Sequence, residues 1–209
     1  NTLVSDLLGG ASLTDVSGNN VYTISISAED AAVSASDLVS TTSLTSNPVN
    51  ISNVTDITSS SISDIQDFLI ATLAGEFGDQ IGDPDSTILT SITLSDETID
   101  ATALDETIGL IESIYGDLTT QIKLASEATI NIDASEIVQL LLDAEDTGLT
   151  ISDQNFVVTD SISVDIANAL SEITSGTITA SIATDSTVDS LKTLTGTNAY
   201  TISISSTDA

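Results

Sequence analysis

The sequence predicts an α/β fold, a repetitive solenoid in which short parallel strands alternate with short helices. First, segments rich in Ile, Val and Thr alternate with segments whose apolar residues fall at helical spacing. Second, the segment 23–27 alternates Ile with Ser and Thr, which is typical of a strand with one buried face. Third, AYTISIS at 199–205 nearly duplicates VYTISIS at 21–27, and such a return indicates internal repetition.

A doubly wound α/β sheet is the alternative, because right-handed parallel crossovers join strand–helix–strand units in both folds. Its strands are buried on both faces and would need nearly continuous apolar runs. The hydroxyl side chains in 23–27 and 201–205 therefore favour the solenoid. We expect one continuous array over 1–209, with a long period from about Tyr22 to Tyr200 and a possible insert at 59–87, where the pattern is interrupted.

The elements follow from apolar spacing, with period two for strands and near 3.6 for helices. In chain order we expect a helix at 2–8, strand at 21–27, helix at 30–39, strand at 49–52, helix at 63–74, loop at 75–86, strand at 88–94, helix at 101–114, strands at 121–124 and 129–132, helix at 134–144, strand at 155–158, helix at 164–173, strand at 177–182, helix at 187–194 and strand at 199–204. Pro48 suits the entry to its strand, and glycines punctuate the loop.

Two details of these elements can be checked residue by residue. In the repeated strands we expect Ile24, Ile26, Ile202 and Ile204 to face the core, with Ser25 and Ser203 facing outward. At helix entries we expect side-chain oxygens to accept free backbone N–H groups, and the candidate N-caps are Ser63, Asp100, Asp133 and Ser163. Part of the acidity of the chain therefore has a structural interpretation.

The charge balance limits the possible partners. Asp and Glu total 32, whereas Lys123 and Lys192 are the only basic residues, and the formal net charge is −30. Nucleic acids and anionic lipid surfaces would repel such a chain, so we expect neither as a partner. Self-repulsion favours a saline or calcium-containing medium, which indicates an extracellular or cell-surface location. No apolar run reaches about 18 residues, so we also expect no membrane span.

The best candidate metal site is the acidic, glycine-punctuated loop GEFGDQIGDPDS. Its Asp79, Asp83 and Asp85 could supply the oxygen ligands that calcium prefers, with Glu76 nearby. The alternative is an ordinary solvated acidic loop, because the spacing fits no EF-hand. A second acidic cluster, 143–146, falls at a predicted helix C-terminus, where negative charge is unfavourable. Calcium is the one cofactor that the sequence suggests.

The sequence contains no recognisable set of catalytic residues. Without His, no Ser-His-Asp relay can be assembled. Three Tyr and three Phe scarcely supply the aromatic platforms of a glycosidase cleft, and no phosphate-binding loop is present. We therefore expect a protein that is not an enzyme.

Several longer segments carry a resemblance to a known group. They are LSDETIDATALDETI at 94–108, VTDSISVDIANAL at 158–170 and TLTGTNAYTISISSTDA at 193–209. In these segments the chain resembles the giant Asp/Thr/Ser/Ala-rich tandem-repeat cell-surface proteins of marine cyanobacteria. The resemblance implies a surface, adhesion or motility-associated role, with no catalytic residues to transfer.

Together these observations predict a structural segment of an extracellular fibre, surface layer or adhesive stalk built from stacked repeats. The alternative is a calcium-dependent binding module of a large cell-surface adhesin, with 59–87 as its working surface. Because the ends of a solenoid expose edge strands, we expect end-to-end continuation into a thread. That continuation can be covalent, within a giant chain, or can arise from self-association of subunits.

Overall fold

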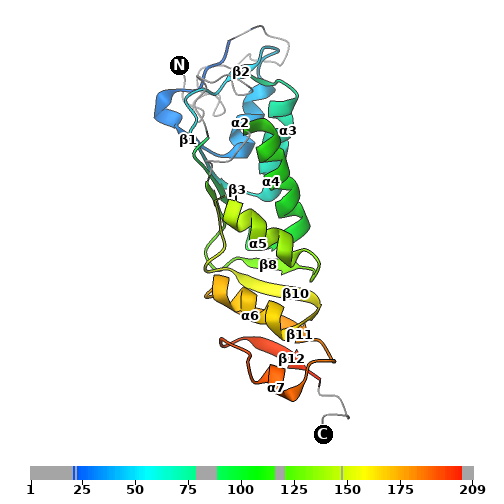
Figure 1. Ribbon diagram of the computed structural model, residues 1–209. Helices are drawn as coiled ribbons and strands as arrows, with labels where there is room; N and C mark the ends of the chain where they lie inside the picture. Colours follow the sequence, from blue (N-terminus) through cyan, green and yellow to red (C-terminus); the bar gives the residue numbers. More distant parts are fainter. Residues whose placement is uncertain (1–20, 22, 79–88, 116–120, 147, 204–209) are drawn as a thin grey trace.

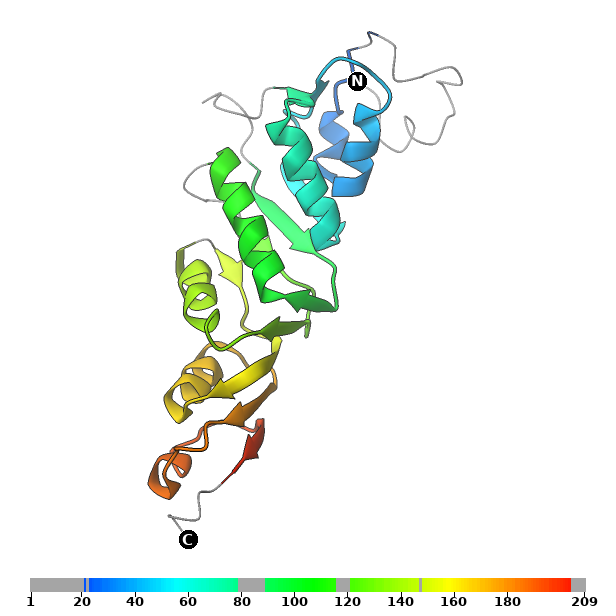
Figure 2. The ribbon, with the colours of Figure 1, turned by 90° about the vertical axis from the view of Figure 1, so that its right-hand side faces the viewer.

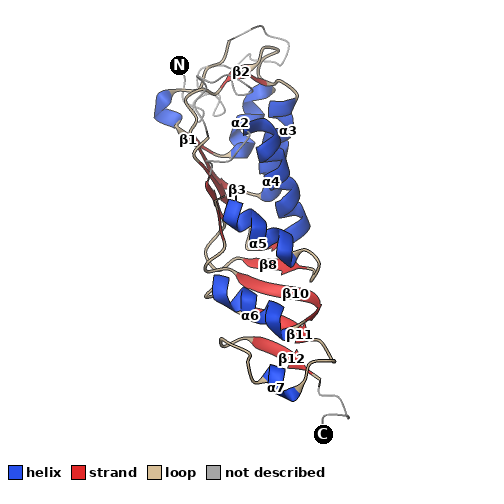
Figure 3. Ribbon diagram, in the orientation of Figure 1, coloured by secondary structure: helices blue, strands red, loops and turns tan. Residues whose placement is uncertain are grey.

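The computed structural model describes residues 21, 23–78, 89–115, 121–146 and 148–203. Strands and helices alternate along an elongated stack, with its first and last described elements at opposite ends (Figures 1 and 3). Helices α2, α3 and α4 lie side by side, and α5, α6 and α7 continue toward the C-terminal end (Figure 2). The predicted α/β class with parallel strands is confirmed.

The secondary structure is made of short elements. In chain order they are η1 (Ala28–Asp30), β1 (Ala32–Val33), α2 (Ala35–Thr42), β2 (Val49–Asn50), β3 (Asp56–Ser60), α3 (Ile62–Leu73), β4 (Phe77–Gly78), β5 (Ser91–Leu94), β6 (Thr98–Asp100), α4 (Ala101–Tyr115), β7 (Gln121–Lys123), β8 (Thr129–Ile132), α5 (Ile137–Asp146), β9 (Leu149–Thr150), β10 (Asn155–Ile162), α6 (Val164–Ile173), β11 (Ile178–Ile182), α7 (Val188–Leu191) and β12 (Ala199–Ile202). We call each helix from α2 on, together with the one to three strands that precede it after the previous helix, a strand–helix unit.

All the strand pairs are parallel, and they form three sheets in the described part of the chain. The N-terminal sheet has the order β1-β3-β5-β7-β9, the C-terminal sheet has the order β6-β8-β10-β11-β12, and β2 pairs with β4. Strands in both five-stranded sheets follow one another in chain order. A doubly wound sheet reverses its order at a switch point, and neither of these sheets does so.

Aliphatic residues occupy matching positions on neighbouring strands. In the N-terminal sheet the aligned and buried residues are Val33, Ile57, Ile92, Ile122 and Leu149. In the C-terminal sheet they are Ile99, Ile130, Phe156 and Ile178. These rows join one hydrophobic core that runs through the stack. Full burial of such a side chain stabilises the fold by about 1.5–3 kcal/mol.

The helices close the core with one apolar face each. In α3 the buried residues include Ile65, Phe68 and Leu69, which recur at helical spacing. The Phe68 ring lies 5.3 Å from that of Phe77 in β4, measured between centroids. Gln66 Nε2 donates to Thr107 Oγ1 at 3.1 Å, and this hydrogen bond links α3 to α4.

Asparagine side chains connect consecutive units through backbone hydrogen bonds. Asn155 Nδ2 donates to the Glu127 carbonyl of one neighbouring segment at 2.8 Å, and Asn155 Oδ1 accepts from Thr177 N–H of the next at 2.8 Å. One unit later, Asn198 Oδ1 accepts from Ile178 N–H at 3.0 Å. These amides satisfy backbone groups before or at the starts of strands, and they connect each unit to the next.

Two of the four predicted N-caps are confirmed. Ser163 Oγ accepts from Ile166 N–H at 3.2 Å at the start of α6. Asp100 Oδ1 accepts from the N–H groups of Thr102 and Ala103 at 3.1 and 3.3 Å. Each cap satisfies donors that have no partner inside the helix, a contribution of about 1 kcal/mol.

The other two N-cap predictions were wrong. The N-cap of α3 is Ser61 rather than Ser63, and its Oγ accepts from Asp64 N–H at 3.1 Å. Asp133 does not cap α5, because its carboxylate instead accepts a hydrogen bond from Thr159 Oγ1 on β10. Helix α5 therefore begins later than expected, at Ile137.

The largest correction to the predicted elements concerns additional strands. Sequence periodicity did not predict β1, β3, β4, β6 or β9, so the units of α3 and α6 have one strand more than expected and the unit of α4 has two more. The predicted helix at 30–39 is in fact η1, β1 and α2, because Ser34 caps α2 and stops it from extending further back. In place of the predicted strand at 21–27, the described residues of this segment form an isolated bridge from Ser25 to Asn50. The predicted helix at 2–8 lies outside the described residues.

The repeated strands differ in burial. Ile26 is buried as predicted, with its N–H donating to the Asn50 carbonyl at 2.9 Å. Ile202 is 44% exposed, so its predicted core position was wrong. The reason is its place in the sheet, since β12 pairs with β11 and has no second neighbour among the described residues.

The remaining positions of this prediction are mixed. Ser203 is exposed as expected, whereas Ile24 and Ser25 are both half-buried. Ile204 lies outside the described residues. The alternation of Ile and Ser therefore sets which face each residue occupies, but the neighbouring unit decides whether that face is covered.

Candidate functional site

The exposed face at the C-terminal end of the stack, formed by β12 and the segment of α7, is the first candidate site. In β11, Ala180 and Ile182 are 5% and 3% exposed. Their register partners in β12 are Tyr200 and Ile202, of which Tyr200 is half-buried and Ile202 is 44% exposed. Positions that are buried in β11 are therefore more exposed to solvent in β12, the last described strand.

The helices at this end of the stack show the same change. In α6, Ala167 and Leu170 are completely buried. In the following unit, Leu191 and Leu194 are only half-buried, and α7 has no buried residue. Apolar surface on the helix and on the strand therefore lies open at the same end of the stack (Figure 1).

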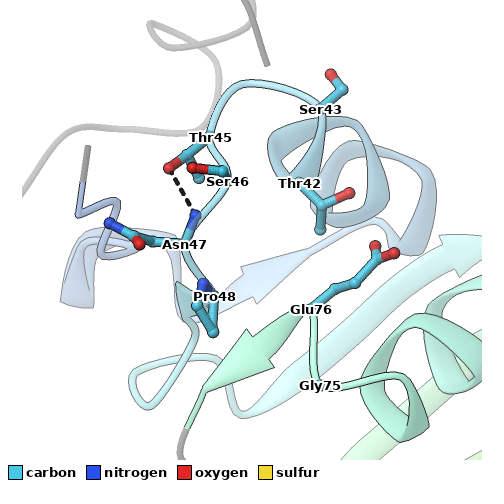
Figure 4. A pocket seen from close by; sticks show the side chains of 8 residues that line it. All are labelled: Thr42, Ser43, Thr45, Ser46, Asn47, Pro48, Gly75 and Glu76. Carbon is cyan, nitrogen blue, oxygen red and sulfur yellow. Dashed lines mark hydrogen bonds between the residues drawn. The ribbon is translucent and has the colours of Figure 1, made fainter. Parts of the chain in front are cut away.

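A polar pocket of about 420 Å³ is the second candidate, and it lies toward the N-terminal end. It is formed by the loop after α2 and the turn after α3, and Glu76 extends toward Thr42 across it (Figure 4). The lining residues are Thr42, Ser43, Thr45, Ser46, Asn47, Pro48, Gly75 and Glu76.

The pocket presents hydrogen-bond acceptors. Thr42 Oγ1 donates its proton to the Val39 carbonyl and Ser43 Oγ donates to the Ser40 carbonyl, each at 2.8 Å. A hydroxyl has one proton, so both oxygens offer only lone pairs to the pocket. The Glu76 carboxylate and the partially negative C-terminal ends of α2 and α3 add to this character. The pocket therefore suits a ligand that carries positive charge or donates hydrogen bonds.

A buried carboxyl between α4 and α5 is the third candidate. Asp143 is 7% exposed, and Gln139 Nε2 donates to its Oδ1 at 2.7 Å. Burial raises the pKa of Asp143, and the nearby charges of Asp105 and Glu112 raise it further. Both effects destabilise the charged form of this carboxyl relative to an exposed one.

Asp56 on β3 has the opposite electrostatic environment. Its carboxylate accepts from Ser91 Oγ at 2.5 Å, from Thr55 Oγ1 at 2.7 Å and from Thr90 Oγ1 at 3.1 Å. These hydrogen bonds, the one from Ser91 first, hold the pKa of Asp56 below its ordinary value. Because Ser91 and Thr90 belong to the next unit, the ionised Asp56 links two units.

The predicted calcium residues Asp79, Asp83 and Asp85 lie outside the described residues. Of the second predicted cluster, Asp143 is buried between α4 and α5, and Glu145 and Asp146 belong to the last turn of α5. In the part of the chain that the structure describes, no three acidic side chains are placed so that they could hold a metal ion.

Sequence reasoning missed the contact between Asp143 and the acidic residues of α4. One signal was available, because Asp143 follows the buried Leu140 by three positions and so continues the apolar face of α5. The partner helix could not be identified from spacing alone. The polar pocket was also missed, since it joins two loops from different units.

Comparisons with known proteins identify no relative: no family model, no curated protein and no solved structure matches this chain. Among the helices in the described ranges, none has both the length and the apolar character needed to cross a membrane.

Proposed function

We propose that this chain is a structural segment of an extracellular fibre, surface layer or adhesive stalk, in which strand–helix units stack as an α/β solenoid. Three features support the proposal: both main sheets grow in chain order, aliphatic rows continue from unit to unit, and asparagine side chains connect neighbouring units. In such an array each unit contacts mainly its neighbours.

The observation that carries this proposal is the open face at β12. Ile182 is 3% exposed and its register partner Ile202 is 44% exposed, although both occupy the same face of the sheet. The difference arises because another unit covers Ile182. A further unit placed on β12 would cover Ile202 in the same way and would satisfy the strand edge. The proposal therefore includes end-to-end continuation into a thread.

The charge of the chain supports a location outside the cell or on its surface. A net charge of −30 opposes close approach of units or subunits unless ions screen it. At 1 M salt the screening length falls to about 3 Å, so stacking becomes easier in concentrated saline. Thread formation should accordingly require a salty medium.

Sedimentation velocity of the purified chain in 1 M sodium chloride tests the proposal. Ile202→Glu places a charge on the open face and should abolish concentration-dependent association. Val138→Glu is a matched control, because Val138 is 62% exposed on α5, away from the open face. It should associate like the wild-type chain.

Stacking at β12 would be contradicted by any of three results, of which the first concerns the wild type and the second both variants together. One is a wild-type chain that stays monomeric at every concentration in concentrated salt. Another is equal loss of association in both variants, which would indicate a general effect of added charge. Association lost only in Val138→Glu would place the contact on the helical side instead.

A cation-dependent binding module of an adhesin is the second candidate function, and the acceptor-lined pocket favours it. Calcium should then raise the melting temperature with saturation at low concentration, and Glu76→Gln or Asp83→Asn should weaken the effect. Sodium chloride at matched ionic strength is the control for screening. Equal stabilisation by both salts would reject a specific calcium site.

A further inference from the structure

The groove between α3 and α4 is a surface that the stacking of units does not explain. It has a volume of about 510 Å³, and its lining residues are Gln66, Ile70, Glu106, Gly109, Leu110 and Ser113. The two helices are adjacent, and the hydrogen bond from Gln66 to Thr107 holds them together at the groove. Four of its six lining residues, Ile70, Glu106, Gly109 and Ser113, are exposed.

Apolar side chains are exposed in and beside the groove. Ile70, which lines it, is 56% exposed, and Leu73, one turn further along α3 and outside the lining, is 47% exposed. Leu110 of α4 is half-buried and completes the apolar strip. Covering this strip would remove apolar surface from water, which favours association.

Gly109 is an independent sign that the groove is kept open. It lies in the interior of the 15-residue helix α4, where Gly is less stable than Ala. A Cβ built at Gly109 would meet nothing within 4 Å, so the chain's own packing does not require Gly. The absence of a side chain at Gly109 would instead allow another molecule to approach the helix backbone closely.

The charges around the groove select the occupant. Helices α3 and α4 carry only acidic charges: Asp64, Asp67, Asp105, Glu106 and Glu112. Glu106 lines the groove itself. Basic side chains at the edge of an apolar partner would therefore be complementary, whereas a second copy of this chain or an anionic polymer would be repelled.

We propose that the groove docks a basic amphipathic helix of a partner protein. A helix fits because its apolar stripe can enter the groove between two neighbouring helices, with Gly109 allowing close approach. The 12 residues of α3 and the 15 of α4 extend about 18 and 22 Å, so the docked helix has about three to four turns. Lys or Arg beside its apolar stripe would face Glu106.

Isothermal titration of the full chain with three synthetic helical peptides tests this proposal. The first peptide carries Leu at i, i+3 and i+4 spacing with Lys elsewhere, the second replaces Lys by Glu, and the third replaces Leu by Ser. The first should bind, more weakly as salt rises, and the other two should bind at least about tenfold more weakly.

Gly109→Leu and Ile70→Ser locate the binding site, and Ala169→Leu is the control. Gly109→Leu fills the groove and should weaken binding of the first peptide by at least about tenfold. Ala169→Leu makes a comparable enlargement at a half-buried position of α6 and should leave binding unchanged. Circular dichroism checks that both variants remain folded, and Ile70→Ser should weaken binding if Gly109→Leu alters the fold.

The proposal is overturned if the first peptide, with Leu and Lys, does not bind, or if the third peptide, with Ser in place of Leu, binds equally well. It is likewise overturned if Gly109→Leu and Ile70→Ser are both folded and bind the first peptide like the wild type. It is also overturned if Gly109→Leu abolishes self-association of the chain in concentrated salt. That result would make a second copy the occupant.

Discussion

Replacing Gly176 by Ala should destabilise the fold, because the backbone leaves no room for a Cβ there. A Cβ at Gly176 would overlap the carbonyl of Gln154, and it would lie 3.0 Å from Asn155 N. The carbonyl cannot move easily, because Thr174 Oγ1 donates to it at 2.6 Å and Gln154 is 1% exposed. Overpacking of this kind costs about 1–3 kcal/mol.

Gly109→Ala is the control, since it makes the same chemical change where the Cβ meets nothing. In the helix interior it should stabilise the fold by about 0.5–1 kcal/mol. Urea unfolding followed by circular dichroism should therefore move the two midpoints in opposite directions. If Gly176→Ala is neutral or stabilising, the close approach of the two units at Gln154 is wrong.

Four further substitutions give three predictions of known sign. Asp143→Asn should stabilise the protein at neutral pH, because burial raises the pKa of Asp143 above 3.8 and the wild type loses stability as pH rises through that raised pKa. Thermal unfolding followed against pH should show that the stability gained by the variant vanishes in acid. A gain that stays constant with pH would contradict this prediction. Asp56→Asn should destabilise the protein at neutral pH, because hydrogen bonds hold the pKa of Asp56 below 3.8. The wild type loses this stability as pH falls through the lowered pKa. If the stability difference between wild type and variant is unchanged in acid, the hydrogen bonds from Ser91, Thr55 and Thr90 do not stabilise the carboxylate as described. Ile182→Ala should cost about 2–5 kcal/mol and Ile202→Ala clearly less, and equal losses in urea unfolding would mean that β12 is covered.

Helices with a strong apolar period could be predicted from the sequence almost to their ends. The predicted helix at 164–173 matches α6, and that at 101–114 is one residue shorter than α4. Their positions followed from local information, namely apolar spacing and a capping oxygen at Ser163 or Asp100. Where an oxygen had a competing partner, as Asp133 has in Thr159, the predicted start was wrong.

Short strands could not be predicted in the same way. β1 and β9 have two residues each, so they contain no period, and β3 contains only one aliphatic residue, Ile57. They exist because neighbouring units hold their backbones in register, as Ile57 is paired with Ile92. That information lies about one unit away along the chain, and no local pattern carries it.

The candidate sites depended even more on distant parts of the chain. The exposure of Ile202 is decided by what covers β12, and the acceptor character of the pocket is decided by hydroxyl protons that Thr42 and Ser43 direct to their own helix. The sequence indicated the acidity and the repetition of the chain. It did not indicate that Gly109 and Ile70, from successive helices, line the same groove.

Amide hydrogen exchange in β12, measured at increasing protein concentration in 1 M salt, tests stacking most directly. Amides of β11 should be protected at every concentration, because this strand is paired on both sides. Amides of β12 should exchange quickly in dilute samples and become protected as threads form, while Ile202→Glu should keep them fast. If threads form and the β12 amides exchange as quickly as before, the stacking surface lies elsewhere and the proposed solenoid continuation is wrong.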